Sequence, residues 1–375
     1  MMFKVYEDKI DLYNIEKDED DLYLDVSGSA WYLDYLQIGK ASGILARKSH
    51  FYPTNEISRG DISSALYRLL TYLKPKEIVE PVPVVETPVE PPVVTTPTPV
   101  VVPTSTNPFS GASLYVDPYS KAKSIAGLEE IASQSTARWF GDWNSDIESS
   151  VNSYVTTVAK AGALPVMVIY NIPGRDCGSY SSGGSSDGDD YRSWVQNFAN
   201  GVGSRKAVVI LEPDALPLDC LYASSVELMS DAVDILKSKP SISVYLDSGH
   251  PNWTSSTEMA RRLTLANVEK ADGFALNVSN FYTTAENIEY GKKISALVGG
   301  KHFIIDTSRN GSGWNGEWCN PSGMTLGQNP STNTGEELVD AYLWVKPPGE
   351  SDGNCNGGPN AGSWWQEYAF DLLAN

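Results

Sequence analysis

Polar and acidic side chains follow several β-branched segments in the C-terminal two thirds of the sequence, where they could perform acid–base chemistry. They are Asp176, Glu212, Asp214, Asp247, His250, Asn277, Asp306 and Lys346. Carboxyl groups held close together repel one another, which raises the pKa of one of them and leaves a protonated acid beside ionised neighbours. The pattern therefore predicts general acid catalysis by a carboxyl group.

Other kinds of catalytic site fit the sequence less well. The chain contains only three histidines, His50, His250 and His302, and no Ser-His-Asp order. This disfavours a catalytic triad and a multi-histidine metal site. We expect no metal and no organic cofactor, because a carboxylic acid and a water molecule suffice for hydrolysis.

Seven or eight short segments are rich in Val, Ile and Leu, and most of them lead into these polar residues. Segments of helical character separate them. Continuous hydrophobic runs predict strands buried on both faces, and the intervening helices predict parallel crossovers. The predicted fold class is α/β, and a barrel whose strand ends carry the catalytic groups fits better than a doubly wound open sheet. The predicted strands begin at Ser113, Ala137, Leu164, Lys206, Ile242, Gly273, His302 and Ala341.

Aromatic residues are abundant, with ten tryptophans and twenty tyrosines. Aromatic faces stack on pyranose rings, although a single tryptophan is more often part of a hydrophobic core. Five tryptophans lie beside the predicted strand ends or in their loops, and together they favour a cleft that binds glycans. They are Trp139, Trp253, Trp314, Trp318 and Trp344.

The composition limits the partners of the chain. Of its 375 residues 41% are hydrophobic and 20% are charged, so most of the chain has the material for a packed core. A formal charge of −19 disfavours nucleic acid and anionic membrane surfaces. No run of about 18 apolar residues is present that could span a membrane, and no secretory signal is readable at the N-terminus.

Residues 75–107 predict a linker, because the stretch from Pro75 to Pro108 holds 10 of the 23 prolines and no aromatic residue. The linker separates an N-terminal module of unknown function (1–74) from a catalytic domain (108–375). In the module, residues 61–73 predict an amphipathic helix. The module could bind an unknown partner. Its acidic cluster at 18–21 lacks the spacing of a calcium loop, and its aromatic residues at 31–35 fit either a sugar-stacking face or a core.

Four cysteines lie at Cys177, Cys220, Cys319 and Cys355. None of them belongs to a C-x-x-C pair, which disfavours a zinc ribbon. An even number allows three disulfide pairings, and four thiols in a reducing compartment are the alternative.

Six ordered motifs give a specific resemblance. They are YNIPGRDCGSYSSGG from Tyr170, VILEPDALPLDC from Val209, YLDSGHPNW from Tyr245, IDTSRNGSG from Ile305, EWCNPSG from Glu317 and LWVKPPGESDG from Leu343. In this order they resemble glycoside hydrolase family 6, the endoglucanases and cellobiohydrolases that act on cellulose. The resemblance covers residues 107–375, about 70% of the chain. It implies a distorted, TIM-like barrel of parallel strands and cleavage of β-1,4-glucan with inversion.

The resemblance also implies catalytic roles. Asp214 in EPDAL matches the general acid, and Asp176 in GRDC matches a neighbour that raises the pKa of this acid and orders water together with Ser182. Asp352 in GESDG matches the residue proposed as general base, although a water molecule could relay the proton instead. An inverting reaction needs roughly 6.5–9.5 Å between its two carboxyl groups, which leaves room for the attacking water. Without the resemblance, each aspartate has an equally good structural explanation. Asp214 would cap the N-terminus of a helix, Asp176 would form a salt bridge with Arg175, and Asp352 would lie in a turn.

The remaining matched positions, with Trp139 and Trp253 from the five tryptophans, form the predicted substrate-binding set, whose members would hold or distort the sugar. It comprises Tyr170, Trp139, Ser182, Asp247, His250, Trp253, Asn277, Trp344, Lys346 and Glu350.

The resemblance favours consecutive disulfides, Cys177 with Cys220 and Cys319 with Cys355. Disulfides and a cellulose substrate imply an extracellular, oxidising setting, in contrast to the absence of a readable signal. The loops at 179–191 and 310–344 look short, which predicts an open cleft and endo action on internal bonds. Exo action by a cellobiohydrolase, or a noncatalytic glycan-binding protein on the same scaffold, are the alternatives.

Overall fold

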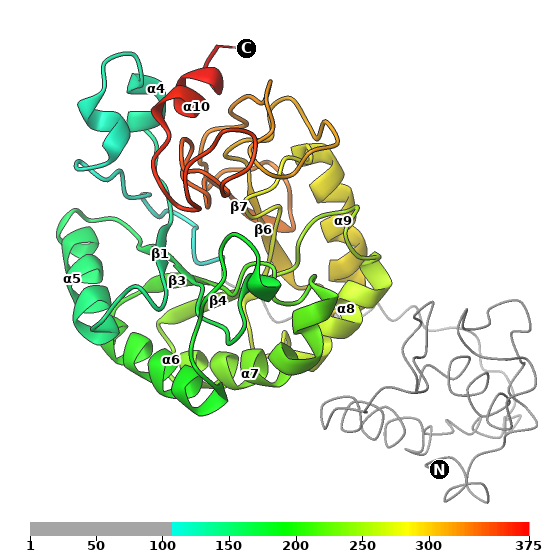
Figure 1. Cartoon of the computed structure of the whole chain (residues 1–375). Coiled ribbons are helices and arrows are strands. Elements are labelled where there is room, and N and C mark those ends of the chain that lie inside the picture. The colour runs from blue at the N-terminus through cyan, green and yellow to red at the C-terminus, as the bar shows by residue number, and fades with distance from the viewer. Residues whose placement is uncertain (1–106, 375) are drawn as a thin grey trace, which may run out of the picture. The chain divides into compact units, whose positions relative to one another are not determined.

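The computed structural model describes residues 107–374 (Figure 1). The predictions for the N-terminal module, for its helix at 61–73 and for the linker at 75–106 lie outside the described residues. Seven strands form one sheet in the order of the sequence, and every neighbouring pair is parallel. They are β1 (Arg138–Phe140), β2 (Val166–Ile169), β3 (Ala207–Leu211), β4 (Ile242–Asp247), β5 (Gly273–Leu276), β6 (His302–Asp306) and β7 (Val339–Leu343).

The sheet is curled into a distorted barrel, as predicted. Its edge strands meet at one point, where the amide of Ala137 donates a 3.0 Å hydrogen bond to the carbonyl of Trp344. The predicted strand that begins at Ser113 is not part of the sheet. It forms only an isolated bridge between Leu114 and Leu164. Its extended segment soon reaches Pro118, which has no amide hydrogen to donate to a neighbouring strand.

Side chains of successive strand residues point to opposite faces of the sheet, and both faces are buried. In β2, Met167 packs outward against the helices, whereas Val168 packs into the barrel interior with Tyr245. This explains why the strands read as continuous hydrophobic runs. Full burial of such a side chain contributes about 1.5–3 kcal/mol, so the two layers hold the strand ends firmly in place.

Five long helices form an arc outside the strands in Figure 1. Four of them begin at a side chain that accepts a hydrogen bond from an amide of the first turn: Asp146, Asp187, Ser255 and Thr283. Such caps contribute about 1 kcal/mol each. The helices are α5 (Ile147–Lys160), α6 (Gly188–Val202), α7 (Asp219–Lys237), α8 (Ser256–Leu265) and α9 (Thr284–Leu297). No helix within residues 107–374 is both long and apolar enough to cross a membrane.

Short helices pack beside the junction of β1 and β7. There, α4 (Glu129–Ala132) and α10 (Gln366–Asp371) lie together (Figure 1). Leu128, Ile131 and Ala369 pack around Trp344 in one small core. Two 3₁₀ turns, η2 (Lys121–Ser124) and η3 (Asp176–Gly178), complete the described helices.

Candidate active site

The backbone is strained where the chain leaves β2 and β3. Four residues other than glycine have positive φ there: Asp176 (56°), Cys177 (49°), Glu212 (49°) and Asp214 (73°). Backbone in this region costs of order 1–3 kcal/mol per residue and persists only where the surroundings enforce it. The strain therefore marks the two segments that carry the predicted acid and its predicted neighbour.

Asp214 is half-buried, and its surroundings favour the protonated carboxyl group. Burial raises its pKa well above the ordinary value, and the charges of Asp247, Asp176 and Asp352 raise it further. The ammonium group of Lys346 acts in the opposite direction without reversing the shift. The structure thus brings together the carboxyl groups that the sequence predicted to meet, and their mutual repulsion favours the protonated form of Asp214.

Asp247 anchors the turn that carries Asp214. The amide of Asp214 donates a 2.9 Å hydrogen bond to Asp247 Oδ2, and the amide of Gly249 donates to the same oxygen over 3.3 Å. Asp247 is 1% exposed, and burial raises its pKa to about 7. Within the described residues its other oxygen, Oδ1, has no hydrogen-bond partner. A buried carboxyl group with one unpaired oxygen leaves an acceptor open beside the acid.

Asp176 lies on a loop that Arg175 fixes. Its Oδ2 accepts a 2.7 Å hydrogen bond from the amide of Ser181. Burial raises the pKa of Asp176, and this outweighs the hydrogen bond and the charge of Arg175. Arg175 does not pair with Asp176. It binds Asp142 over 3.0 Å and the carbonyls of Tyr170 and Ser181 over 2.6 and 2.7 Å.

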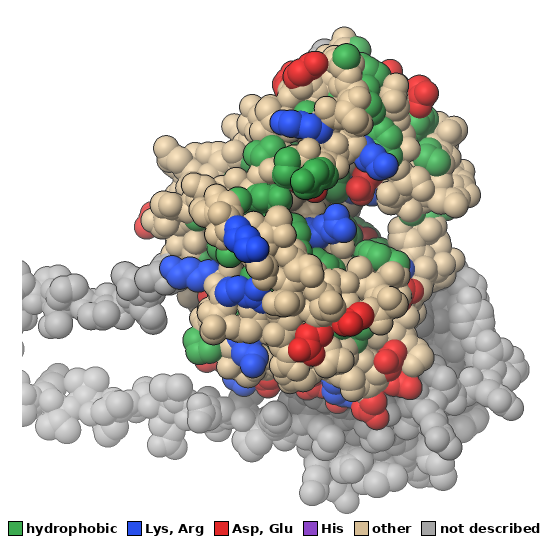
Figure 2. Space-filling view, turned by 90° about the vertical axis from the view of Figure 1, so that its left-hand side faces the viewer, with side chains coloured by type: hydrophobic (Ala, Val, Ile, Leu, Met, Phe, Trp, Pro, Cys, Tyr) green, Lys and Arg blue, Asp and Glu red, His purple; other side chains and the backbone are tan. Residues whose placement is uncertain are grey.

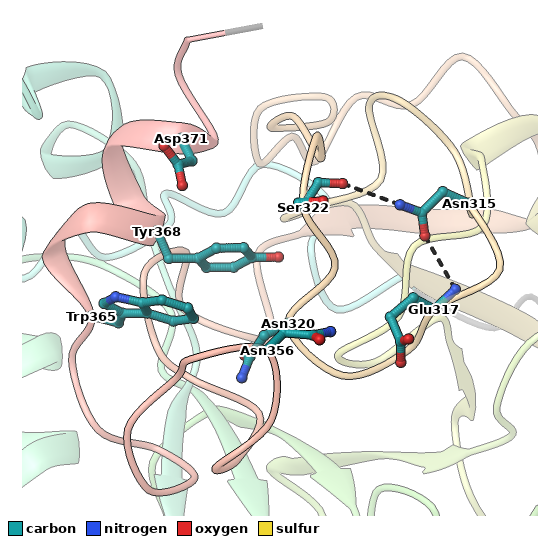
Figure 3. A pocket seen from close by; sticks show the side chains of 8 residues that line it. All are labelled: Asn315, Glu317, Asn320, Ser322, Asn356, Trp365, Tyr368 and Asp371. Carbon is teal, nitrogen blue, oxygen red and sulfur yellow. Dashed lines mark hydrogen bonds between the residues drawn. The ribbon is translucent and has the colours of Figure 1, made fainter.

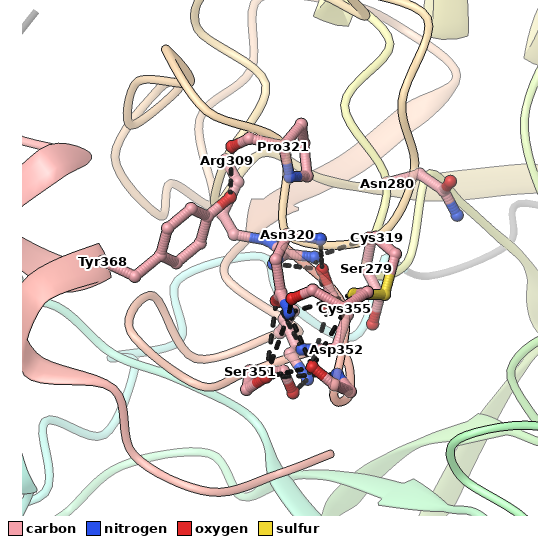
Figure 4. A network of polar contacts seen from close by, with 12 residues as sticks. Ser279, Asn280, Arg309, Cys319, Asn320, Pro321, Ser351, Asp352, Cys355 and Tyr368 are labelled. Carbon is pink, nitrogen blue, oxygen red and sulfur yellow. Dashed lines mark hydrogen bonds and ion pairs between the residues drawn. A yellow bond between two sulfur atoms is a disulfide. The ribbon is translucent and has the colours of Figure 1, made fainter. Parts of the chain in front are cut away.

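Asp352 lies in a network of hydrogen bonds and ion pairs (Figure 4). Arg309 donates two hydrogen bonds to it, of 2.9 and 3.0 Å, and the amide of Asn320 donates a third over 3.0 Å. Lys346 Nζ lies 3.6 Å from Oδ1. Burial alone would raise the pKa of Asp352, but the charges of Arg309 and Lys346 prevail and lower it. Asp352 is therefore an ionised carboxylate.

Lys346 and Glu350 lie beside Asp352 in the loop after β7. Lys346 Nζ donates a 3.0 Å hydrogen bond to the carbonyl of Ser351. Burial raises the pKa of Glu350, and the charge of Lys346 reduces the shift. Both predicted residues thus belong to the electrostatic surroundings of Asp352.

Asp306 and Glu212, two strand-end carboxyl groups, organise loops rather than face the mouth. Asp306 is 1% exposed and accepts hydrogen bonds from the amides of Ser279, Ser308, Val345 and Lys346. Glu212 is fully buried and accepts from the amides of Asn171 and Ile172. Each carboxylate fixes the segment that follows a neighbouring strand.

Four aromatic rings form a continuous row. Trp253 lies 5.1 Å from His250, His250 stacks on Tyr282 at 4.3 Å, and Tyr282 stacks on Trp314 at 5.2 Å between ring centroids. Burial lowers the pKa of His250 to about 4, so its imidazole is neutral near pH 7. Trp253 remains partly exposed and Trp314 is 45% exposed. The row has the rigid apolar rings that sugar stacking requires.

Tyr170 contacts both Trp139 and Arg175, and Arg175 donates a 3.3 Å hydrogen bond to the carbonyl of Ser182. The Tyr170 ring packs edge-on against Trp139 at 5.3 Å, and the Arg175 guanidinium lies 4.7 Å from the Tyr170 centroid. The charges of Asp214 and Asp176 add to burial in raising the pKa of Tyr170, which places this residue close to both. Ser182 is exposed.

Two residues of the predicted substrate-binding set, Trp344 and Asn277, donate side-chain hydrogen bonds to main-chain carbonyls. Trp344 is 1% exposed, and its Nε1 donates a 3.0 Å hydrogen bond to the carbonyl of Gln328. Asn277 is fully buried, and its amide nitrogen donates to the carbonyls of Asp306 and Asn280. Their side chains turn into the protein and stabilise loops, so a contact of either residue with a sugar stays a prediction.

Both disulfides have the consecutive pairing that the resemblance implies. Cys177 is bonded to Cys220, and Cys319 is bonded to Cys355. The first joins the Asp176 loop to the start of α7. The second joins the segments that carry Asn320 and Asp352. Each bridge therefore constrains backbone next to a carboxyl group of the site.

The face on the side of α4 and α5 is hollowed between an upper and a lower part, and hydrophobic and basic side chains gather around the hollow (Figure 2). Among residues 107–374, no three or more His, Cys, Asp or Glu side chains are arranged to hold a metal ion. The expectation that catalysis needs no cofactor stays a prediction.

The sequence analysis missed three residues of the site: Arg309, Asn320 and Tyr282. Arg309 is fully buried, which a charged residue tolerates only with partners, and it follows β6 in the quoted motif IDTSRNGSG. An arginine in that position, among so many acidic strand ends, is the signal that could have revealed its pairing with Asp352. Asn320 and Tyr282 carry no comparable signal.

Comparisons with known proteins agree with this geometry. Residues 102–375 match the family described as "Glycosyl hydrolases family 6". Endoglucanase A of Cellulomonas fimi is 47% identical over 283 residues, which cover 72% of this chain and 62% of that protein. The chain thus spans less than two thirds of the length of that relative.

Two further comparisons concern a solved structure and a more distant relative. The endoglucanase Cel6 of Mycobacterium tuberculosis, solved in complex with methyl-cellobiosyl-4-deoxy-4-thio-beta-D-cellobioside, is 45% identical with a TM-score of 0.69. The match covers 71% of this chain and 98% of that chain. The 1,4-beta-D-glucan cellobiohydrolase C of Emericella nidulans is 30% identical over 364 residues, which cover 72% of this chain and 78% of that protein.

Proposed function

The chain belongs to family 6 of the glycosyl hydrolases, and on that premise we propose that it hydrolyses internal β-1,4-glucosidic bonds in cellulose and related β-glucans with inversion. One observation carries this proposal. The pKa of Asp214 is raised while that of Asp352 is lowered, within one network of charges. An acid and a base that act at the same pH require two carboxyl groups whose pKa values are shifted in opposite directions.

In the proposed reaction, Asp214 donates its proton to the glycosidic oxygen as the bond from this oxygen to the anomeric carbon breaks. A water molecule attacks the anomeric carbon from the opposite face, and its proton passes to Asp352 directly or through a second water. Asp176 keeps the pKa of Asp214 high, and Tyr170 lies close to both. The lowered pKa of Asp352 keeps this carboxyl group ionised, as a proton acceptor must be.

The lengths of the alignments support endo action. The cellobiohydrolase needs 364 aligned positions to cover the same 72% of this chain that the endoglucanase covers in 283. The cellobiohydrolase therefore carries longer insertions. Short loops leave the cleft open, so that an internal segment of the polymer can enter it from the side.

The anomer released first tests the proposal. NMR of cello-oligosaccharide hydrolysis should show the α-anomer before mutarotation, and a β-anomer would contradict inversion. On carboxymethylcellulose, we expect viscosity to fall faster than soluble sugar appears, whereas exo action gives the reverse. If the wild-type chain and the Asp214→Ala variant both bind cellulose and neither hydrolyses it, the chain is a noncatalytic glycan-binding protein.

We further propose that the enzyme works outside the cell. The disulfides Cys177–Cys220 and Cys319–Cys355 support an oxidising compartment, and a polymeric substrate requires an enzyme that reaches it. The N-terminal module (1–74) and the linker (75–107) would attach the catalytic domain to a further partner. Detecting the chain in culture medium tests the location, and binding studies with residues 1–106 test the module.

A further inference from the structure

A polar pocket of about 510 Å³ lies between the loop at 315–322 and α10 (Figure 3). Trp318 belongs to the same loop, and its ring packs 6.0 Å from Tyr180, a residue of the Asp176 loop. None of the residues that we assign to catalysis lines it. The lining residues are Asn315, Glu317, Asn320, Ser322, Asn356, Trp365, Tyr368 and Asp371.

The lining has the chemistry of a polyol-binding site. The partly exposed Trp365 stacks on the buried Tyr368 at 5.3 Å and 18°, which holds the Trp365 ring rigidly at the pocket. The other residues offer amide, hydroxyl and carboxylate groups, and no Lys or Arg is among them. An anion would therefore be repelled, and an apolar ligand would leave these polar groups without partners. A sugar ring presents one apolar face and a rim of hydroxyl groups, which matches both parts of the lining.

The backbone of the pocket is fixed before any ligand binds. Asn315 Nδ2 donates a 3.1 Å hydrogen bond to the carbonyl of Ser322, and the hydroxyl of Tyr368 donates to the carbonyl of Pro321 over 3.1 Å. Asn356 Nδ2 donates to the carbonyl of Cys319 over 2.9 Å. A site with rigid walls loses little entropy when it binds a ligand.

Several polar groups of the pocket are still available. Within the part of the chain that the structure describes, no hydrogen bond engages the carboxylate of Glu317, the hydroxyl of Ser322 or Oδ1 of Asn356. The three groups lie around the hollow in Figure 3. They offer two acceptors and one group that both donates and accepts, as a set of sugar hydroxyls requires.

We propose that this pocket binds a short β-linked gluco-oligosaccharide, as a second saccharide site separate from the catalytic cleft. The preference for a polyol follows from the lining alone, whereas the choice of glucose rests on the proposed function. The pocket shares a wall with the catalytic network, because Asn320 lines it and also exchanges two hydrogen bonds with Asp352, of 3.0 and 2.7 Å.

Hydrogen exchange of the full chain with cellobiose as the probe tests the site. Cellobiose should slow exchange in a peptide that covers α10, which lies on the pocket. The double variant Glu317→Gln/Ser322→Ala should raise the midpoint of this protection at least tenfold. Its control, Glu367→Gln/Ser363→Ala, alters the same residue types outside the lining and should leave the midpoint unchanged.

Two results would overturn the proposal. One is the absence of cellobiose protection in α10 of the wild-type chain. The other is protection that survives the pocket variant but disappears in Trp253→Ala, because the effect would then originate in the cleft. The chain could also show protection of α10 that the pocket variant removes and yet hydrolyse no glucan. This result would support the second site and contradict the proposed function.

Retention on insoluble cellulose distinguishes the source of the sugar. If the pocket variant also binds cellulose less tightly than its control, the pocket holds ends of the polymer. If only the response to cellobiose is lost, the pocket holds soluble product. Either result supports the saccharide site.

Discussion

The main-chain amide of Asp214 donates a 2.9 Å hydrogen bond to Oδ2 of Asp247, so the geometry and the charge of Asp214 depend on one neighbouring carboxyl group. The charge of Asp247 raises the pKa of Asp214, and burial raises it more strongly. The same contact stabilises the strained φ of 73° at Asp214. Position and protonation of the acid are therefore coupled through Asp247.

Asp247→Asn should lower the pKa of Asp214 without moving its backbone, because the asparagine oxygen can still accept from the amides of Asp214 and Gly249. We expect the alkaline limb of the pH profile of kcat/KM on cello-oligosaccharides to shift to lower pH. The control Asp187→Asn removes an exposed charge and keeps the helix cap of α6. An alkaline limb that stays in place in Asp247→Asn would contradict the coupling.

Asp247 should also make the folded chain less stable as pH rises. Its pKa is about 7 in the folded chain, against an ordinary value near ~3.9 in the unfolded chain. Below both values the group is protonated in both states. Between about pH 4 and 7 the unfolded chain releases a proton that the folded chain retains, so the free energy of unfolding falls, by on the order of 4 kcal/mol for such a shift.

Urea unfolding at several pH values measures this dependence. Wild type and Asp247→Asn should differ most in slope between pH 4 and 7, where the variant should show a weaker decline. Glu212, whose burial raises its pKa to about 7, contributes to the decline in both chains. Equal slopes in the two chains would exclude Asp247 as a source of the pH dependence.

Arg309→Lys should raise the pKa of Asp352, because lysine retains the charge but not the two parallel hydrogen bonds of 2.9 and 3.0 Å. We expect the acidic limb of kcat/KM to move to higher pH. The free energy of unfolding should fall by about 3 kcal/mol, since a buried ion pair loses its geometry. Urea unfolding and the pH profile together check the prediction, and an unchanged acidic limb would contradict the assignment of Asp352 as the ionised partner.

Replacing Cys177 and Cys220 by serine should reduce both stability and turnover. The bridge spans 43 residues and ends next to Asp176, and loss of such a cross-link costs about 2–4 kcal/mol. We expect kcat to fall several-fold at a temperature where the variant is still folded, because the Asp176 loop is no longer tied to α7. Thermal unfolding and initial rates on cellotetraose measure the two effects. Undiminished kcat in the folded variant would show that the bridge does not position Asp176.

Trp344→Phe separates a core role from a sugar-binding role. Trp344 is 1% exposed, and its Nε1 bonds to the carbonyl of Gln328, so we expect a loss of about 2 kcal/mol of stability and an unchanged KM. Trp253→Phe, in the partly exposed row of rings, should instead raise KM with little change in stability. A raised KM in Trp344→Phe would instead support the predicted role of Trp344 in substrate binding.

The sequence predicted the sheet well, because seven buried parallel strands leave a direct signature of β-branched runs. It could not distinguish the segment from Ser113, whose composition resembles a strand but which forms only the bridge between Leu114 and Leu164. A single bridge depends on where the neighbouring segments lie, which local composition does not encode. The order and direction of the strands followed from the intervening helices.

The site was predictable as a set of strand ends, but not as a set of orientations. Asp214, Asp176 and Asp352 do lie in one network of charges. Asn277 and Trp344, in contrast, point into the protein. Asp306 accepts hydrogen bonds from four main-chain amides. A strand-end position does not specify which way a side chain turns, because the following loop decides it. The partner of Asp352, Arg309, depends on a contact between residues 43 positions apart.

The protonation state of Asp214 is the central claim, and ¹³C NMR of aspartate-labelled protein measures it most directly. The carboxyl signal of Asp214, assigned by its loss in Asp214→Asn, should report a protonated group at the pH of maximal hydrolysis, where ordinary aspartates are already ionised. A signal that shows a fully ionised Asp214 at that pH, while hydrolysis proceeds at its full rate, would contradict the account.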